Sequence, residues 1–134
     1  MNIPFIENMG IELQENGSLY LPFNQKLLNH LGTIHASAQF TLAETQSGFY
    51  LEQMFPQYGD SVIPMLRGSS VKYKNPATKD IYTIATASKE ALEKFNMQFL
   101  KKGRGVIRVE VTVYDSDAVV TMVGEFSWFI SRLV

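Results

Sequence analysis

The sequence predicts an α+β fold in which a curved antiparallel sheet wraps around one long central helix. An apolar segment with helical spacing runs from Ala36 to Met54, and it is broader than the single stripe of a surface helix. A hairpin pattern precedes this segment, and extended segments with strand-like patterns follow it. A curved sheet buries such a helix most economically, because it can cover the helix on most of its sides.

The first predicted element is a hairpin around Asn16-Gly17, the residue pair that tight hairpin turns prefer. Apolar residues alternate with polar ones on both sides of this turn, beginning with Ile11 and Leu13. Residues 24–33 then break the alternation with a glycine, and the helix follows.

The long helix is predicted to begin at Ala36 and to end at the "PQYGD" loop, which starts with Pro56. Leu42, Phe49 and Leu51 widen its apolar surface, so we expect it to be covered on most sides. Small or apolar residues recur along one stripe at three- and four-residue steps: Ala36, Phe40, Ala43, Ser47, Tyr50 and Met54.

Two extended segments follow this helix. Residues 62–76 predict an imperfect strand with a bulge near Gly68. Residues 81–89 predict a second strand that is partly buried on both faces. A short helix or helical turn is expected next, because Leu92, Phe95 and Phe99 recur at helical spacing.

The last two strands have the clearest patterns. Residues 105–114 alternate strictly, with Ile107, Val109, Val111 and Val113 on one face. After a turn at "DSD", residues 118–132 predict a long final strand with a kink at Gly124. Its buried face is predicted to hold Val120, Met122, Phe126, Trp128 and Ile130.

The composition excludes several classes of protein. A chain of 134 residues is the size of one ordinary domain, so we expect a single domain over residues 1–134. The net charge of −1 gives no electrostatic reason to expect a nucleic-acid partner. The absence of cysteine excludes disulfides, thiolate zinc sites and cysteine nucleophiles.

Targeting and metal-binding patterns are absent from the sequence. The start "MNIPFIENMG" lacks the charged and apolar regions of a secretion signal, and no segment approaches the length of a spanning helix. We therefore expect a soluble, cytoplasmic protein without a membrane partner. No further ligand type clusters with His30 and His35, so we expect no metal site.

A family resemblance is carried by the residues around the start of the long helix. Asn29 and Gly32 precede His35, and Leu42-Ala43-Glu44 follows along the helix. "VKYKNPA" and "GRGVIRVEVTVYDSD" add two further matches downstream. In these features the sequence resembles the hotdog-fold thioesterases of the phenylacetate-pathway type, from about residue 10 onward. The resemblance is nearest to bacterial members in which a pair such as Ala-Ser replaces two glycines.

The resemblance implies a hotdog fold and an acyl-CoA thioesterase activity. It implies that Glu44 acts as general base or nucleophile, that Asn29 helps to hold the carboxylate or its water, and that His35 shapes the loop. It also implies that backbone N–H groups at Ala36 and Ser37 hold the developing oxyanion. In the family, glycines occupy these two positions and Asp occupies that of Glu44, so the Cβ atoms here narrow the approach of a thioester carbonyl.

Further substrate contacts are predicted at Phe40, Ser47, Gly68, Ser69 and Arg104. Arg104 lies between two glycines, and this loop could let its side chain reach a phosphate of coenzyme A. Coenzyme A would be part of the substrate, so no cofactor is expected. An acyl-carrier thioester is the other substrate that the resemblance allows.

The residue chemistry of the two main candidates leaves alternatives open. A carboxylate in an apolar cleft can deliver water to a thioester or attack it, but Glu44 could also lie on a narrow solvated stripe. The first N–H groups of the helix, from Ala36 to Gln39, could stabilise an oxyanion. Ordinary capping by Thr33 or Ser37 could also satisfy these donors, and both roles can hold at once.

The spacing of these candidates predicts self-association. Glu44 follows His35 by nine residues, which is about 13 Å along a helix. One thioester carbonyl cannot touch both groups of one chain, so joint catalysis requires a two-fold dimer, alone or within a tetramer. A non-catalytic acyl- or aryl-binding protein on the same scaffold is the alternative. A dehydratase would need a histidine framed by Phe-Pro and Pro-Gly, which the sequence lacks.

Overall fold

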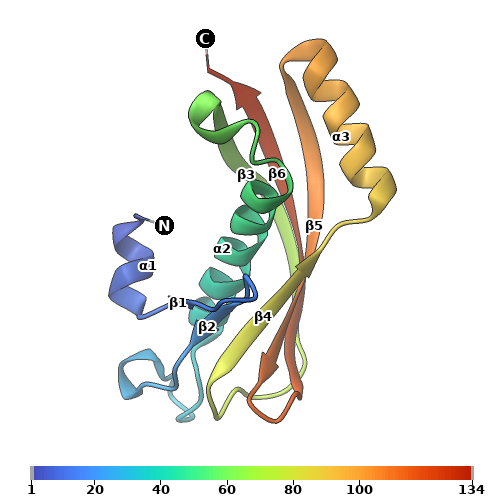
Figure 1. The fold of residues 1–134 in the computed structure, drawn as a ribbon. Coiled ribbons are helices and arrows are strands. Elements are labelled where there is room, and N and C mark those ends of the chain that lie inside the picture. Colours follow the sequence, from blue (N-terminus) through green and yellow to red (C-terminus); the bar gives the residue numbers. More distant parts are fainter. Residues whose placement is uncertain (1, 134) are drawn as a thin grey trace.

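The protein forms a six-stranded antiparallel sheet that curves around one long helix, as predicted (Figure 1). The structure is a computed structural model and describes residues 2–133. The strand order is β1-β2-β4-β5-β6-β3, which places β3 at one edge. The elements are α1 (Pro4–Met9), β1 (Glu12–Leu13), β2 (Leu19–Leu21), η1 (Gln25–Leu27), α2 (Ala36–Met54), η2 (Gly59–Ser61), β3 (Val62–Tyr73), β4 (Ile81–Thr86), α3 (Lys89–Lys102), β5 (Arg104–Asp115) and β6 (Val120–Arg132).

The predicted hairpin is confirmed in β1 and β2, which pair antiparallel across the Asn16-Gly17 turn. Gly17 has φ +86°, a left-handed conformation that glycine adopts without strain. The hairpin joins the main sheet because β2 also pairs with β4. The first strands thereby cover one side of α2.

The predicted bounds of the long helix are confirmed, but part of its predicted buried stripe is wrong. Ala36 and Met54 are exposed. The buried face instead includes Gln39 and Gln46. Buried amides are tolerated when they are hydrogen-bonded: Gln39 Oε1 accepts from Thr121 (2.7 Å), and Gln46 Oε1 accepts from Leu19 N (2.7 Å) and Thr83 (2.6 Å).

The inner faces of the long strands supply most of the core, as their alternation predicted. In β5 the inward residues are Ile107, Val109, Val111 and Val113, and in β6 they include Met122, Phe126 and Ile130. The predicted bulge in β3 is confirmed by a register shift between Leu66 and Gly68. The strands β5 and β6 therefore present these apolar side chains to α2.

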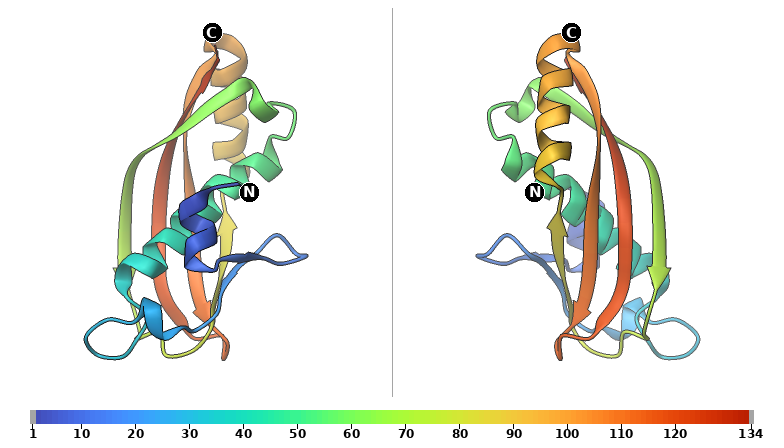
Figure 2. Two further views of the ribbon diagram at one scale, coloured as in Figure 1. Left: turned by 90° about the vertical axis from the view of Figure 1, so that its left-hand side faces the viewer. Right: turned by 90° about the vertical axis from the view of Figure 1, so that its right-hand side faces the viewer.

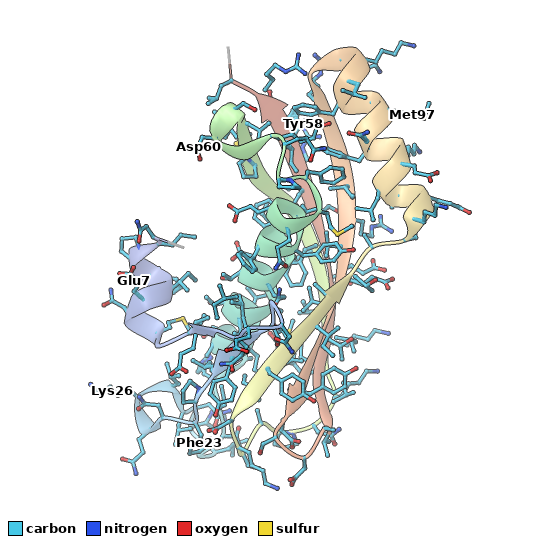
Figure 3. The ribbon with its side chains drawn as sticks, viewed as in Figure 1. Glu7, Phe23, Lys26, Tyr58, Asp60 and Met97 are labelled. Atoms are coloured by element: carbon cyan, nitrogen blue, oxygen red, sulfur yellow. The ribbon has the colours of Figure 1, made fainter. Side chains whose placement is uncertain are left out.

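The segment after β4 is a 14-residue helix, α3, which is longer than the short helix predicted. Ser88 caps its start, and Gly103 ends it at φ +74°. It lies beside the half of β5 that β4 does not reach, because β4 pairs only with residues 110–115 of that strand. Figure 3 shows Tyr58 pointing from the loop after α2 toward this helix, while Met97 points away from the molecule.

The helix α1 was not predicted. Pro4 lies in its first turn and Gly10 ends it at φ +81°, which are ordinary start and stop residues. Figure 1 shows α2 between α1 and the sheet. This short helix therefore covers the side of α2 that the sheet leaves open.

The edge strand β3 is long and largely exposed. Its 12 residues pair with β6 on one side only. Exposed apolar side chains along it include Ile63 and Met65. A long unprotected edge of this kind is a ready template for pairing with another chain. Between residues 2 and 133, no helix has the length and apolar character needed to cross a membrane.

Candidate functional site

Glu44 lies at the middle of α2, on the side that faces α1. Its neighbours one turn away, Thr41 and Gly48, are half-buried like Glu44 itself. Neither a hydrogen bond nor an ion pair is formed by its carboxylate with any residue from 2 to 133. Burial raises the pKa of Glu44 above its ordinary value, which brings the carboxylate closer to the range useful for a general base.

The carboxylate of Glu44 opens on a cleft of about 360 Å³ with mainly apolar walls. Glu44 and Glu52 are the only charged residues that line this cleft among the described residues. The apolar lining comes from α1, α2, β3 and β6, and consists of Ile3, Phe5, Ile6, Gly48, Phe49, Pro64 and Trp128. The cleft thus has the composition of a site for an apolar group beside one carboxylate.

A second cavity of about 300 Å³ adjoins this cleft on the side of the C-terminal half of α2. The two share Gly48, Glu52 and Pro64 in their walls. A Cβ atom on Gly48 would lie 3.2 Å from the Trp128 ring. Glycine at this position therefore lets the indole lie directly against the helix where the two cavities meet.

Two hydroxyl groups beside Glu44 behave differently. Ser47 is fully buried, donates to the Glu44 carbonyl (2.6 Å) and accepts from Trp128 Nε1 (2.8 Å). Its hydroxyl orients the indole, and its predicted contact with substrate remains a prediction. Thr45 also lines the cleft, and its buried hydroxyl has no partner among the described residues. Buried polar groups are normally paired, so the unpaired Thr45 hydroxyl is an exception in the wall of this cleft.

The start of α2 is exposed, and most of its first N–H groups are occupied. His35 is the N-cap: its Nδ1 accepts from Ser37 N (3.0 Å), and its carbonyl accepts from Ala38 N and Gln39 N. Neither Thr33 nor Ser37 caps the helix, so that reading of the sequence was wrong. The Ala36 N–H has no acceptor among residues 2–133, so it is the donor that remains available at the helix start.

The loop before α2 is held by Asn29. Its Oδ1 accepts from the backbone N–H groups of Leu31 and Thr33, and its Nδ2 donates to the Thr33 hydroxyl (2.8 Å). From the other side, the Tyr73 hydroxyl at the end of β3 donates to the Ala36 carbonyl (3.1 Å). These contacts fix the helix start, and the predicted role of Asn29 toward a carboxylate remains a prediction.

The remaining predicted residues are distributed over three parts of the molecule. Phe40 packs against Phe126 in the core, with ring centroids 5.5 Å apart. Gly68 and Ser69 are exposed at the middle of the edge strand β3. Arg104 lies at the start of β5 in a separate basic groove beside α3. One protomer does not bring these residues together.

The two main candidates are also kept apart within one protomer. The helix α2 is continuous from Ala36 to Met54, so Ala36 and Glu44 are separated by about 12 Å along its axis. A single carbonyl group cannot contact both. The separation of these two groups along the helix is therefore confirmed as predicted, while the dimer that would bring them together remains a prediction.

Several residues of the cleft were missed by the sequence analysis. Phe5 and Ile6 belong to α1 and Ile3 is its N-cap; Pro4 and Gly10 could have indicated this helix as start and stop signals. Thr45 and Gly48 carry no sequence signal of their own, because their roles depend on what β6 places against them. In the described part of the chain, no cluster of three His, Asp or Glu side chains could hold a metal ion.

Solved structures with the same fold include thioesterases. A protein from Pseudomonas aeruginosa described as "Probable Thioesterase" has a TM-score of 0.83 at 21% identity, over 98% of this chain and 89% of that one. A protein from Bacillus halodurans, solved with CoA, has a TM-score of 0.75 at 20% identity, over 97% and 77%. The PaaI protein of the Escherichia coli phenylacetic acid degradation operon has a TM-score of 0.67 at 11% identity, over 99% and 86%.

These likenesses confirm the hotdog fold that the sequence predicted. No curated protein matches the sequence. A family described as "Domain of unknown function (DUF4442)" matches residues 4–130, which is nearly the whole chain. The protein therefore belongs to the DUF4442 family and has the hotdog fold.

Proposed function

We propose that the protein hydrolyses acyl thioesters, with Glu44 of one subunit and the start of α2 of a second subunit acting on the same bond. The observation that carries this proposal is the unpartnered, half-buried carboxylate of Glu44 in an apolar cleft. Such a carboxylate is costly to retain for folding alone, because burial opposes its charged form.

The proposed chemistry uses two groups with complementary roles. Glu44 takes a proton from a water molecule, which attacks the thioester carbonyl carbon; direct attack by Glu44 is the alternative. The carbonyl oxygen becomes negative, and the Ala36 N–H at the positive end of α2 donates to it. The C–S bond then breaks, and the thiolate leaves with a proton returned by Glu44.

The edge strand β3 offers a geometry that would bring these groups together. Pro64, near its start, lines the Glu44 cleft, and Tyr73, at its end, contacts the helix start. The midpoint between these two residues lies between Gly68 and Ser69. Two β3 strands paired antiparallel about this midpoint would set Pro64 opposite the partner's Tyr73. Glu44 would then face the partner's helix start, with Gly68 and Ser69 at the seam.

The comparisons support the class of reaction. The Pseudomonas aeruginosa protein is described as a probable thioesterase, and a Haemophilus influenzae protein of the same fold is a thioesterase with a TM-score of 0.76. The Bacillus halodurans protein binds CoA in its crystal structure. Acyl-CoA thioesters are accordingly the substrates to test first, with acyl-carrier thioesters next.

Release of free thiol from acyl-CoAs of short, medium, long and aromatic acyl groups tests this proposal. The protein has no cysteine, so a thiol reagent reports only the released coenzyme A. We expect turnover with at least one class of acyl group, and its loss in Glu44→Gln. Unchanged turnover in Glu44→Gln would remove Glu44 from the mechanism.

Binding without turnover is the second candidate function. The observation that favours it is the Cβ atom of Ala36, which narrows the approach to the one available N–H group of the helix start. In that case acyl-CoA or an acyl compound binds in the cleft but no thiol is released. Ala36→Gly distinguishes the candidates further, because it should increase turnover only if the N–H group contacts the carbonyl.

A further inference from the structure

A basic groove of about 550 Å³, separate from the two cavities beside Glu44, lies on α3, β5, β6 and β3. Of the 12 Lys and Arg residues in the chain, five line this groove: Arg67, Lys94, Lys102, Arg104 and Arg108. No Asp or Glu of the described chain lines it. In a protein with a net charge of −1, this is a marked local concentration of positive charge.

The fold gathers these cations from separate elements. On α3, Lys94 and Lys102 lie on one face with Ala91 and Gln98, at helical spacing. On β5, the strict alternation places Arg104 and Arg108 on the exposed face. The right-hand view of Figure 2 shows α3 lying along this part of β5.

Close packing fixes the relative position of the two basic elements. A Cβ atom on Gly105 would lie 3.0 Å from the Phe95 ring, so glycine lets α3 approach β5 at this point. Phe95 and Phe99 are buried below the helix and anchor it. Gly103 then turns the chain directly from α3 into β5, which sets Lys102 and Arg104 on either side of one turn.

Most of these cations are free to bind a ligand. Arg108 lies 3.8 Å from Glu125, and both side chains are exposed, so this ion pair is weak. Within residues 2–133, Lys94, Lys102 and Arg104 form no ion pair. The Arg67 guanidinium lies over the Phe129 ring, 4.6 Å from its centroid. Phe129 and Val106 also give the groove an apolar surface between the charges.

We propose that this groove binds a nucleotide that carries two or more phosphates. Converging Arg and Lys side chains recognise phosphate oxygens by charge-assisted hydrogen bonds. The exposed Val106 and the half-buried Phe129 with its stacked Arg67 guanidinium offer an apolar and planar surface for a base. The volume lies within the range of small-ligand sites. This proposal goes beyond thioester hydrolysis and does not depend on it, because nucleotide binding needs no turnover.

Calorimetric titration of the intact protein tests the groove. The probes are ADP, adenosine 3′,5′-bisphosphate, coenzyme A and inorganic phosphate, at low salt. We expect the nucleotides to bind more tightly than inorganic phosphate, and Arg104→Glu to weaken them about tenfold or more. Lys101→Glu is the matched control, because Lys101 is exposed in the last turn of α3 but does not line the groove. It should change affinity by less than about twofold.

Two results would overturn the proposal. One is that no nucleotide binds, and the other is that Arg104→Glu and Lys101→Glu weaken nucleotide binding equally. Should Arg104→Glu fail to fold, Lys94→Glu on the exposed face of α3 makes the same prediction. A lower ratio of kcat/KM for an acyl-CoA over its acyl-pantetheine in Arg104→Glu would identify the nucleotide as that of coenzyme A. An unchanged ratio with weaker ADP binding would identify a free nucleotide as the ligand.

Discussion

The first turn and the middle of α2 carry opposite chemistry on one rigid element. At the first turn, the exposed Ala36 N–H has no acceptor among the described residues and lies at the positive end of the helix. At the middle, the half-buried Glu44 carboxylate has no cation or donor in the described chain to balance it. About 12 Å of helix separates them. The two regions therefore complement each other only between two copies of the chain.

Removing the Glu44 carboxylate should have the largest effect on activity. Glu44→Gln keeps the shape of the side chain but cannot accept a proton from water. We expect kcat to fall by between about a hundredfold and ten-thousandfold, the usual contribution of a general base. Thiol release measures kcat, and circular dichroism checks that the fold is retained. A loss of activity that comes only from a higher KM, with kcat unchanged, would contradict the assigned role of Glu44.

Removing the donor at the first turn should have the next largest effect. Ala36→Pro deletes this N–H group, and proline is favoured at the first position of a helix. His35 has φ −59° and ψ 141°, which a residue before proline readily adopts. We expect kcat to fall by about a hundredfold, while Ala36→Gly keeps the N–H group and retains activity. Equal losses in both variants would show that the backbone donor is not what matters.

Separating the two copies should reduce activity less completely. Ser69→Asp adds a charge to each strand at the centre of the proposed β3 seam, opposite the partner's Gly68, so the two added carboxylates lie one position apart and repel. We expect a shift toward monomer in analytical ultracentrifugation and a loss of about tenfold in activity at low protein concentration. Ser116→Asp adds the same charge to the exposed turn before β6 and should change neither property. A fully active monomer of Ser69→Asp would refute the shared site.

The smallest expected effect is on stability. Burial raises the pKa of Glu44 above its ordinary value of 4.5, so the charged form opposes folding. The favourable contribution of the protonated form is complete below the ordinary pKa and is lost as the pH rises through the raised pKa. Glu44→Gln should therefore unfold at a slightly higher temperature than the wild type at neutral pH, and the difference should vanish below pH 4.5. A less stable variant at neutral pH would indicate an unrecognised partner for Glu44.

Much of the framework could be predicted because its signals are local. Asn16-Gly17 fixed the hairpin turn, Pro56 marked the end of α2, and the strict alternation in β5 identified its buried face. The position of Glu44 along α2 also follows from the sequence alone. These features depend on neighbouring residues, which a single sequence contains.

The remaining features depend on contacts between distant segments. Gln46 is buried because Thr83 donates to it from a different strand, and no local pattern indicates such a pair. The six residues of α1 are too few to show a helical period. In the groove, only Arg104 had been singled out, since the other cations reach it from α3, from β3 and from a later position of β5. Sequence spacing does not reveal such convergence.

Mixing two inactive variants tests the shared site most directly. Glu44→Gln and Ala36→Pro are unfolded together, refolded at equal concentrations and assayed for thiol release. Random pairing makes about half of the dimers mixed, and each mixed dimer has one intact site of two, so about a quarter of wild-type activity should return. If the mixture stays as inactive as the separate variants, although mixed dimers are detected by mass spectrometry, then Glu44 and the helix start of a second copy do not act on the same bond.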